Sequence, residues 1–460
     1  MLVTSSALAD RRDGPTAELW RVRLPWNCGP ELVLAALADE PCLCCLSGVW
    51  AGGGTVIACE PLRIGEANAD PFALLDDLPR VGAGRAESFG AVGGGWFGWL
   101  GYRLAARVEQ IPLVDERPVP LPDFHLAYYD HVLHQDAYGF WWFEALATTE
   151  RSAELEQRLE HLRRRVAAQR FADAPADGGS PTPLRLRADV AEHHLRAVAD
   201  CRERIAAGEI FQANICQRLE GEYRGTATEL LRSALIGGRV PQYTAAFDTP
   251  RGGVVSLSPE LFLRRQGRHV KSGPIKGTVH RPGDPERAVL SLQQLQTSAK
   301  DAAEHVMIVD LMRNDLGRVC EYGSVTAPRR PTAEAHPGLW HLVTTVEGRL
   351  RREVGNAELL YAAFPPGSVT GAPKVQALKV IAELEPTGRE VYTGAIGYAS
   401  PLAGLELNVA IRTLELSDGR LWLGVGGGIV ADSDPQAELE ETLVKARPVA
   451  AAIGTTVLSE

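Results

Sequence analysis

Long apolar runs are missing from this chain of 460 residues. A helix needs about 20 mostly apolar residues to cross a membrane, and no unbroken stretch here approaches that length, so we expect no transmembrane segment. The N-terminal residues MLVTSSALADRRDG also lack the basic segment followed by an apolar one that marks a secretory signal peptide. These two absences favour a cytoplasmic protein.

An excess of positive charge is missing as well. The chain has 48 lysines and arginines against 58 acidic residues, a net charge of −10 at pH 7. Proteins that bind nucleic acids or anionic membranes present basic surfaces, so neither is expected as the main partner. The eight cysteines contain one C-x-x-C, from Cys42 to Cys45, but no second pair at zinc spacing, so free thiols are expected.

One segment is typical of a linker: residues 171–184, FADAPADGGSPTPL, are rich in small residues and proline. Just before it, residues 151–170 repeat apolar side chains along one helical stripe. The sequence therefore predicts an N-terminal region over 1–170 and a catalytic domain over 185–455.

The C-terminal region alternates between helical and strand patterns. Helices are expected over 190–208, 298–316, 372–385 and 434–451, and strands over 253–266, 340–349, 403–416 and 420–430. The last two strands follow each other across Ser417-Asp418-Gly419, which is a hairpin signal. The pattern predicts an α+β fold with large mixed or antiparallel sheets covered by helices.

Two segments are rich in glycine. GGGWFGWLGY, residues 93–102, contains a G-x-G-x-x-G, but its aromatic residues favour packing over a dinucleotide site. LGVGGGIV, residues 423–430, leaves two interpretations open: backbone amides that approach an anion, or a tight turn without a ligand.

Carboxylates recur at helical spacing in two segments. Asp301 and Glu304 lie one turn apart, and Glu438, Glu441 and Lys445 fall within a sector of about 60° on a second helix. Two such helices could converge on Mg²⁺, which prefers oxygen ligands. The alternative is that these side chains are solvated helix surface.

Two basic side chains stand in unusual settings. Arg412 follows Asn408 in an alternating strand pattern, which suits either carboxylate binding or an ion pair with a covering helix. Lys276 lies between Pro-Ile and Gly-Thr, where the backbone is expected to be fixed. Such a lysine is either a solvated charge or an amine positioned for chemistry.

Taken together, these segments resemble the chorismate-utilising enzymes. The matching stretches are GEIFQANICQR (208–218), SLSPELF (256–262), GPIKGT (273–278), KDAAEHVMIVDLMRNDLGR (300–318), FPPGSVTGAPK (364–374), YTGAIGY (392–398), NVAIRT (408–413) and GGGIVADSDPQAELEET (426–442). They cover most of 190–450 in order, whereas the N-terminal region resembles the family only through LSG (46–48) and GGGWFGWLGY. The resemblance implies the α+β fold of that family.

The resemblance also implies a Mg²⁺ site and a chorismate pocket. Glu304 and Glu441 would hold the metal, with Asp301 and Glu438 in support through water, and the metal would bind the ring carboxylate. Asp301 stands where the family carries a glutamate. The remaining substrate contacts would come from Gln212, Thr278, His341, Ser368, Tyr392, Arg412, Gly427 and Lys445.

Within the family, two positions separate the branches. Members that add water at C2 carry a lysine where this chain has Gln212, and anthranilate synthases resemble PIAGT where this chain reads PIKGT. The combination resembles component I of the aminodeoxychorismate synthases, which replace the C4 hydroxyl of chorismate by an amine. Lys276 would then add to C2 as the nucleophile, and Glu260 would protonate the leaving hydroxyl.

The ammonia would come from a separate glutamine amidotransferase subunit, because no cysteine here lies in a G-x-C-x-G turn. Two alternatives stay open. One is anthranilate synthase component I, opposed by Lys276 and by LSG where tryptophan-inhibited members resemble LLES. The other is a non-catalytic chorismate-binding subunit, which has no need of Glu260, Glu304, Glu441 and Lys276 together. Whether the product serves p-aminobenzoate and folate or a specialised pathway is left open.

Overall fold

The computed structural model describes residues 16–82, 90–119, 121–169, 179–238, 240–297, 299–328, 330–336 and 339–459, without the side chains of 278, 299–301, 336 and 339. No helix in this part of the chain is long and apolar enough to cross a membrane. The eight cysteines are free thiols, as expected.

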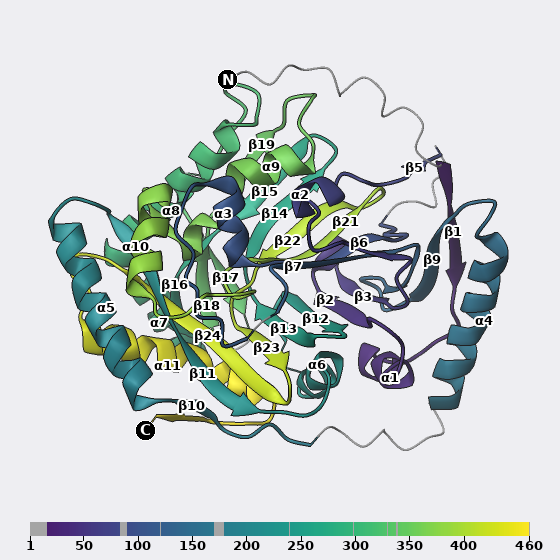
Figure 1. Cartoon of the computed structure of the whole chain (residues 1–460), viewed down its shortest axis with the longest axis horizontal. Coiled ribbons are helices and arrows are strands. Elements are labelled where there is room, and N and C mark those ends of the chain that lie inside the picture. Colours follow the sequence, from purple (N-terminus) through teal and green to yellow (C-terminus); the bar gives the residue numbers. More distant parts are fainter. Residues whose placement is uncertain are drawn as a thin grey trace.

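Two large, mainly antiparallel sheets form the body of the molecule (Figure 1). The larger has fourteen strands, in the spatial order β25 (Val457–Ser459), β10 (Leu184–Leu186), β11 (Gln212–Glu222), β24 (Arg420–Ile429), β23 (Thr413–Ser417), β13 (Gly252–Ser258), β12 (Tyr243–Thr249), β2 (Cys44–Gly48), β3 (Gly54–Ala58), β8 (His131–Gln135), β9 (Trp141–Ala147), β1 (Thr16–Arg23) and β5 (Arg80–Val81), with β20 (Gly371–Ala372) beside β11. Strands from before and after residues 171–184 therefore share one sheet.

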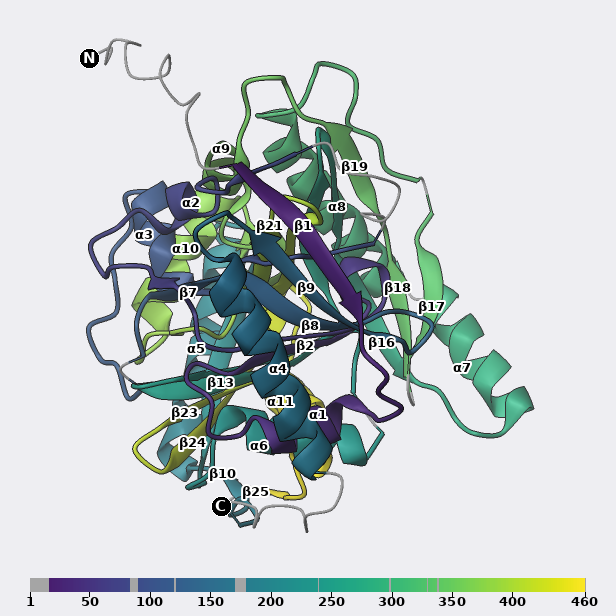
Figure 2. The same cartoon turned by 90° about the vertical axis from the view of Figure 1, so that its right-hand side faces the viewer.

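The second sheet has eight strands and also mixes both parts of the chain. Its spatial order is β19 (Val346–Arg349), β15 (His269–Gly273), β14 (Leu261–Gln266), β22 (Gly404–Val409), β21 (Ala395–Ser400), β6 (Gly95–Leu100), β7 (Phe124–Tyr129) and β4 (Arg63–Ile64). A third, three-stranded sheet contains β16 (Ile275–His280), β18 (Leu339–Val343) and β17 (Thr332–His336). Figure 2 shows this small sheet and α7 (Pro285–Thr297) at one side of the molecule.

The two large sheets pack face to face around an aromatic core. Trp50, Phe97, Trp99, Tyr398 and Trp422 lie in one buried cluster between them. On the outer face of the larger sheet lie α1 (Pro30–Ala36), α4 (Ser152–Gln169), α5 (Ala188–Ala206), α6 (Ala227–Ile236), α10 (Lys374–Leu384) and α11 (Pro435–Ala452). The smaller sheet is covered by α2 (Pro71–Leu74), α8 (Ala299–Gly317) and α9 (Asn356–Ala363), and the short α3 (Ala105–Val108) follows β6. The expected α+β architecture is confirmed.

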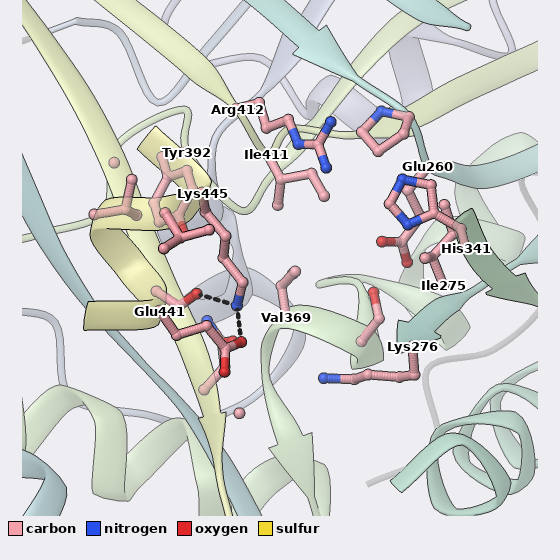
Figure 3. A pocket seen from close by; sticks show the side chains of 18 of the residues that line it. Glu260, Ile275, Lys276, His341, Val369, Tyr392, Ile411, Arg412, Glu441 and Lys445 are labelled. Atoms are coloured by element: carbon pink, nitrogen blue, oxygen red, sulfur yellow. Dashed lines mark hydrogen bonds and ion pairs between the residues drawn. The ribbon is translucent and has the colours of Figure 1, made fainter. Parts of the chain in front are cut away.

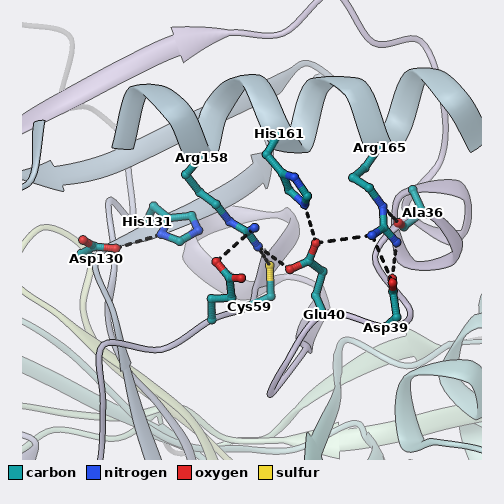
Figure 4. A network of polar contacts seen from close by, with 10 residues as sticks. Ala36, Asp39, Glu40, Cys59, Asp130, His131, Arg158, His161 and Arg165 are labelled. Carbon is teal, nitrogen blue, oxygen red and sulfur yellow. Dashed lines mark hydrogen bonds and ion pairs between the residues drawn. The ribbon is translucent and has the colours of Figure 1, made fainter. Parts of the chain in front are cut away.

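The helix expected over 151–170 is α4, and its apolar stripe is buried as the spacing predicts. Polar residues beside this stripe bind the loop after α1 (Figure 4). Arg158 and His161 both reach Glu40, each at 2.8 Å, and Arg165 donates to Asp39 at 3.1 Å. Packing and ion pairs together fix α4 against the edge of the large sheet.

The glycine cluster before residue 100 serves packing, as predicted. Gly95 and Gly98 lie in β6 with φ of 136° and 155°. A Cβ at Gly98 would stand 1.7 Å from the carbonyl oxygen of His125 on the neighbouring strand. Only glycine lets the two backbones approach this closely.

Three of the expected strands each turned out to be two strands in different sheets, and one of them, 340–349, divides into β18 of the third sheet and β19 of the small one. Between the two large sheets, the segment 253–266 divides into β13 of the large sheet and β14 of the small one, and 403–416 divides into β22 and β23. The chain passes between the sheets near Glu260 in the first case and at Arg412 in the second. The expectation that Arg412 continues the alternation of Asn408 was therefore wrong, because Arg412 has a left-handed φ of 51° and ends it.

Candidate active site

A cavity of about 380 Å³ lies where the two crossings meet β24, α11 and the small third sheet (Figure 3). The predicted residues that line it are Glu260, Lys276, Glu304, His341, Ser368, Tyr392, Arg412, Glu438, Glu441 and Lys445. Gln212 and Gly427 lie beside this lining, as described below. The side chains of Thr278 and Asp301 fall outside the described residues, so the predictions for them stay predictions.

The two crossings are tied to each other by their backbones. The N–H of Val409 donates to the carbonyl of Glu260 at 3.0 Å, and the N–H of Leu257 donates to the carbonyl of Arg412 at 3.0 Å. Ser258 adds a hydroxyl bond to the carbonyl of Val409 at 2.6 Å. These bonds hold the two crossings side by side, so that the carboxyl of Glu260 and the guanidinium of Arg412 line the same cavity.

Glu260 is almost fully withdrawn from water, with 3% of its surface exposed. Burial raises the pKa of Glu260 to about 7, although hydrogen bonds from Ser368 and the Ile275 N–H act in the opposite direction. A carboxyl with this pKa carries its proton for much of the time near neutral pH. It can therefore act as a general acid toward a group in the cavity.

Lys276 extends from β16 into the cavity, and its amine faces β24. A Cβ at Gly428 would lie 3.2 Å from its Nζ and 2.1 Å from Nε2 of Gln212, so lysine and amide meet over this glycine. Burial lowers the pKa of Lys276; Glu304 opposes this change and Lys445 adds to it. Lowering the pKa increases the fraction of neutral amine, which is the nucleophilic form.

Gln212 is 1% exposed, and its Oε1 has no hydrogen-bond partner within the described residues. The next residue on the same strand face is Asn214, which lines the cavity and which the sequence interpretation missed. Side chains two apart on a strand share a face, so the period of two starting at Gln212 could have identified it. The sequence showed no pattern that would identify the apolar lining residues Val369, Ile411 and Val444.

The glycine-rich segment belongs to the strand expected over 420–430, because residues 424–428 lie inside β24. The interpretation as a tight turn was therefore wrong, and contact of its amides with an anion stays a prediction. A Cβ at Gly424 would lie 2.3 Å from Cγ of Tyr392, and one at Gly426 would lie 2.6 Å from Sγ of Cys216. Side chains from neighbouring segments thus rest directly on the strand backbone. Gly427 faces Glu438 and Lys445, at 3.0 Å and 3.9 Å from a Cβ position to Oε2 and Nζ.

Helix α11 presents its polar side chains to the cavity as their spacing predicts. Asp434 caps the helix by accepting the Ala437 N–H at 2.9 Å, ahead of Pro435 in the first turn. Lys445 pairs with Glu441 at 2.8 Å and donates to the carbonyl of Gly426 at 3.0 Å. These two bonds point the amine of Lys445 along β24, and Figure 3 shows the pair on the side of the cavity across from Glu260.

Three carboxylates could serve a metal ion here: Glu304 from α8, and Glu438 and Glu441 from α11. Glu438 is buried and accepts the Ser433 hydroxyl at 2.6 Å, whereas Glu441 is exposed. No three such ligands are gathered closely enough among the described residues to hold a metal by themselves. The donor chemistry fits Mg²⁺, which usually takes one or two carboxylates and completes its shell with water and substrate oxygens.

Comparisons with known proteins show the family of this chain. A family model described as chorismate binding enzyme matches residues 60–451. The chain is 37% identical over 365 residues to aminodeoxychorismate synthase component 1 of Klebsiella aerogenes, covering 76% of this chain and 75% of that protein. It is 34% identical over 408 residues to anthranilate synthase component 1 of Streptomyces coelicolor, covering 86% and 79%.

Solved structures give the same result for the fold. The crystal structure of anthranilate synthase component I from Streptococcus pneumoniae matches 98% of this chain and 94% of its own chain, with a TM-score of 0.71 and 26% identity. The menaquinone-specific isochorismate synthase MenF of Escherichia coli shares the fold, with a TM-score of 0.71 at 16% identity. This chain belongs to the family of chorismate-binding enzymes.

Proposed function

We propose that this enzyme converts chorismate and ammonia into 4-amino-4-deoxychorismate, with Lys276 as a covalent nucleophile. The observation that carries the proposal is the amine of Lys276 next to Gln212, in the cavity that Glu260 also lines. The similarity to aminodeoxychorismate synthase component 1 supports it. The product would feed p-aminobenzoate and folate synthesis or a specialised pathway.

The reaction has two displacements with matched bond changes. The Nζ of Lys276 adds to C2, both ring double bonds shift, from C1=C2 to C1=C6 and from C5=C6 to C4=C5, and the C4 hydroxyl leaves as water with the proton of Glu260. Ammonia then adds to C4, both double bonds shift back, and the bond between Nζ and C2 breaks. One proton of the added ammonia returns to Glu260, so each turnover consumes one ammonia and releases one water.

Charge complementarity supports the substrate pose. Arg412, Tyr392 and Lys445 would hold the enolpyruvyl carboxylate, with the amides near Gly427, while His341, Ser368 and Thr278 line the ring. Mg²⁺ would be held by Glu304 and Glu441, with Asp301 and Glu438 in support. When bound, it would neutralise the ring carboxylate, which the surrounding carboxylates alone would repel.

The ammonia would be supplied by a separate glutaminase subunit, as the component 1 designation of the K. aerogenes relative suggests. The cysteines support this because none has the sequence setting of a glutaminase nucleophile, and burial raises the pKa of Cys45 well above its usual range and the pKa of Cys216 to about 12. The purified chain alone should release no glutamate from glutamine. Glutamate release would contradict the need for a partner.

A mass-resolved product assay tests the function. The purified chain is mixed with chorismate, Mg²⁺ and an ammonium salt at alkaline pH, and the products are separated. A product that keeps the enolpyruvyl group and carries an amine in place of the hydroxyl is expected. Omission of Mg²⁺ with added chelator should abolish it.

The second candidate is an anthranilate synthase, favoured by the 34% identity to the S. coelicolor protein. It predicts anthranilate and free pyruvate in the same assay, which would contradict the role of Lys276. A third outcome is chorismate binding that depends on Mg²⁺ but gives no product with ammonia. That result would favour a non-catalytic binding subunit.

A further inference from the structure

A second cavity, of about 400 Å³, lies behind the active site. It is enclosed by the first half of α5, by β11 and by the loop that connects α10 to β21. Tyr392 lines both cavities, so one side chain forms part of the wall between them. None of the residues assigned to the reaction other than Tyr392 lines this second space.

Two buried polar side chains that line this cavity have unsatisfied atoms. His194 is 2% exposed, and neither ring nitrogen has a hydrogen-bond partner within the described residues. Gln217 is 6% exposed; its Nε2 donates to Thr442 at 2.6 Å, while its Oε1 has no partner within the described part of the chain. Leaving such groups unsatisfied is costly, so a polar ligand in the cavity would gain from pairing them.

The unsatisfied atoms of His194 and Gln217 determine which hydrogen-bonding groups a ligand needs at the buried end of the cavity. Burial lowers the pKa of His194 to about 4, so its ring is neutral at pH 7 and provides one donor and one acceptor. The Oε1 of Gln217 is an acceptor only. The nearby carboxylate of Glu385 is already occupied by Arg389 and by the N–H of Cys216. An uncharged amine therefore fits this end better than an ammonium cation, which would need a free carboxylate.

The outer end of the cavity carries a free positive charge. Arg187 is paired with Asp189 at 2.8 Å, and Glu220 is paired with Arg420 at 3.1 Å. Arg196, which is exposed, has neither an ion pair nor a hydrogen bond from its side chain among the described residues. A guanidinium of this kind binds a carboxylate through two parallel hydrogen bonds.

The cavity also offers an apolar surface. Val190, Ala197 and Leu384 line it together with Pro386. Glu116 is exposed on the same lining, where water and salt screen its charge. The apolar side chains suit a flat hydrocarbon body.

We propose that this second cavity binds a small aromatic amino carboxylate, with its amine at Gln217 and His194 and its carboxylate at Arg196. An aromatic amine is uncharged at neutral pH, unlike the amine of an α-amino acid. The proposal concerns binding in the absence of chorismate, so it holds or fails separately from the proposed function.

Isothermal titration calorimetry on the full chain tests the proposal with 4-aminobenzoate as the probe. We expect one site, bound at least about tenfold more tightly than benzoate, which lacks the amine. The variants Arg196→Gln and His194→Phe should each weaken 4-aminobenzoate binding about tenfold or more. Arg164→Gln, which removes another exposed guanidinium from α4, should leave the dissociation constant unchanged.

The proposal would be overturned by the absence of 4-aminobenzoate binding, by equal weakening in Arg164→Gln, or by displacement of the probe by saturating chorismate, which would place it in the first cavity. Tighter binding of L-leucine than of 4-aminobenzoate would also overturn it, because the inner end would then accept a cationic amine. Circular dichroism checks that each variant is folded. If His194→Phe fails to fold, the comparison of 4-aminobenzoate with benzoate on the unmodified chain still decides the question.

Discussion

Glu260 and Lys276 are both withdrawn from water, and this withdrawal shifts each toward its uncharged form. The uncharged carboxyl can give a proton, and the uncharged amine can attack carbon. Their opposite roles in the proposed reaction therefore rest on one physical cause. Ser368 and Arg412 moderate the shift at Glu260 by favouring its carboxylate.

Removal of the amine tests the nucleophile directly. Lys276→Met keeps the length of the side chain but has no amine, so formation of 4-amino-4-deoxychorismate is expected to fall about a thousandfold or more. The measurement is the initial rate with saturating ammonium. Lys271→Met on the neighbouring strand β15 serves as the control, because Lys271 does not line the cavity. A rate within about tenfold of the unmodified enzyme would contradict covalent catalysis.

The pH dependence tests Glu260. Its protonated form is the acid, so the rate should fall as the pH rises through about 7, the pKa of Glu260. Initial rates are measured across this range with the concentration of neutral ammonia held constant. In Glu260→Gln the rate should be at least about a hundredfold lower than in the unmodified enzyme. The rate of this variant should also no longer fall as the pH rises through about 7. A variant that kept the same alkaline limb would show that another group titrates.

Strand β24 forms one wall of the active-site cavity. Its glycines are explained by what lies on them: the ring of Tyr392, the thiol of Cys216, and the amide of Gln212 beside Lys276. A side chain at position 424, 426 or 428 would displace a wall of the cavity. The shape of the active site therefore depends on the absence of side chains at these glycines of β24.

A methyl group at position 424 should disturb both packing and binding. In Gly424→Ala the Cβ would lie 2.3 Å from the ring of Tyr392, so we expect a loss of about 1–3 kcal/mol in the free energy of unfolding and weaker chorismate binding. Urea unfolding and a chorismate titration measure the two effects. Gly237→Ala is the control, because Gly237 has a helical φ of −68° and only ordinary contacts at its Cβ position. Equal effects at both positions would contradict this explanation of β24.

The whole molecule is joined across the predicted linker by backbone hydrogen bonds. In the large sheet β2 pairs with β12, and in the small sheet β6 pairs with β21. Neither part of the chain completes either large sheet without the other. The boundary predicted at 171–184 therefore separates segments of sequence that share both sheets.

This arrangement predicts cooperative unfolding of the two regions. Hydrogen exchange followed by mass spectrometry in moderate urea should show peptides of β2 and β12 losing protection together, since opening either strand exposes its partner. Strand β25 serves as the control for local opening, because it is short and lies at the edge of the large sheet, so its amides should exchange earlier. Loss of protection in β2 and β3 well before β12 and β13 would indicate an independently unfolding N-terminal region.

The sequence by itself determined the family, the helices α4, α5, α8, α10 and α11, and most of the polar side chains that line the cavity. Helical spacing placed Glu438, Glu441 and Lys445 on one face of α11, because neighbours three and four residues apart share a helix face. The turn at Ser417-Asp418-Gly419 was also readable, since it joins consecutive antiparallel strands through local hydrogen bonds.

Only the tertiary structure decided where the chain passes between the sheets and where the second cavity lies. Arg412 adopts a left-handed conformation that local preference disfavours for such a residue, and contacts with distant strands impose it. The loop between α10 and β21, which completes the second cavity, is far in the sequence from His194 and Gln217. Such features arise from long-range packing, for which a single sequence carries no periodic signal.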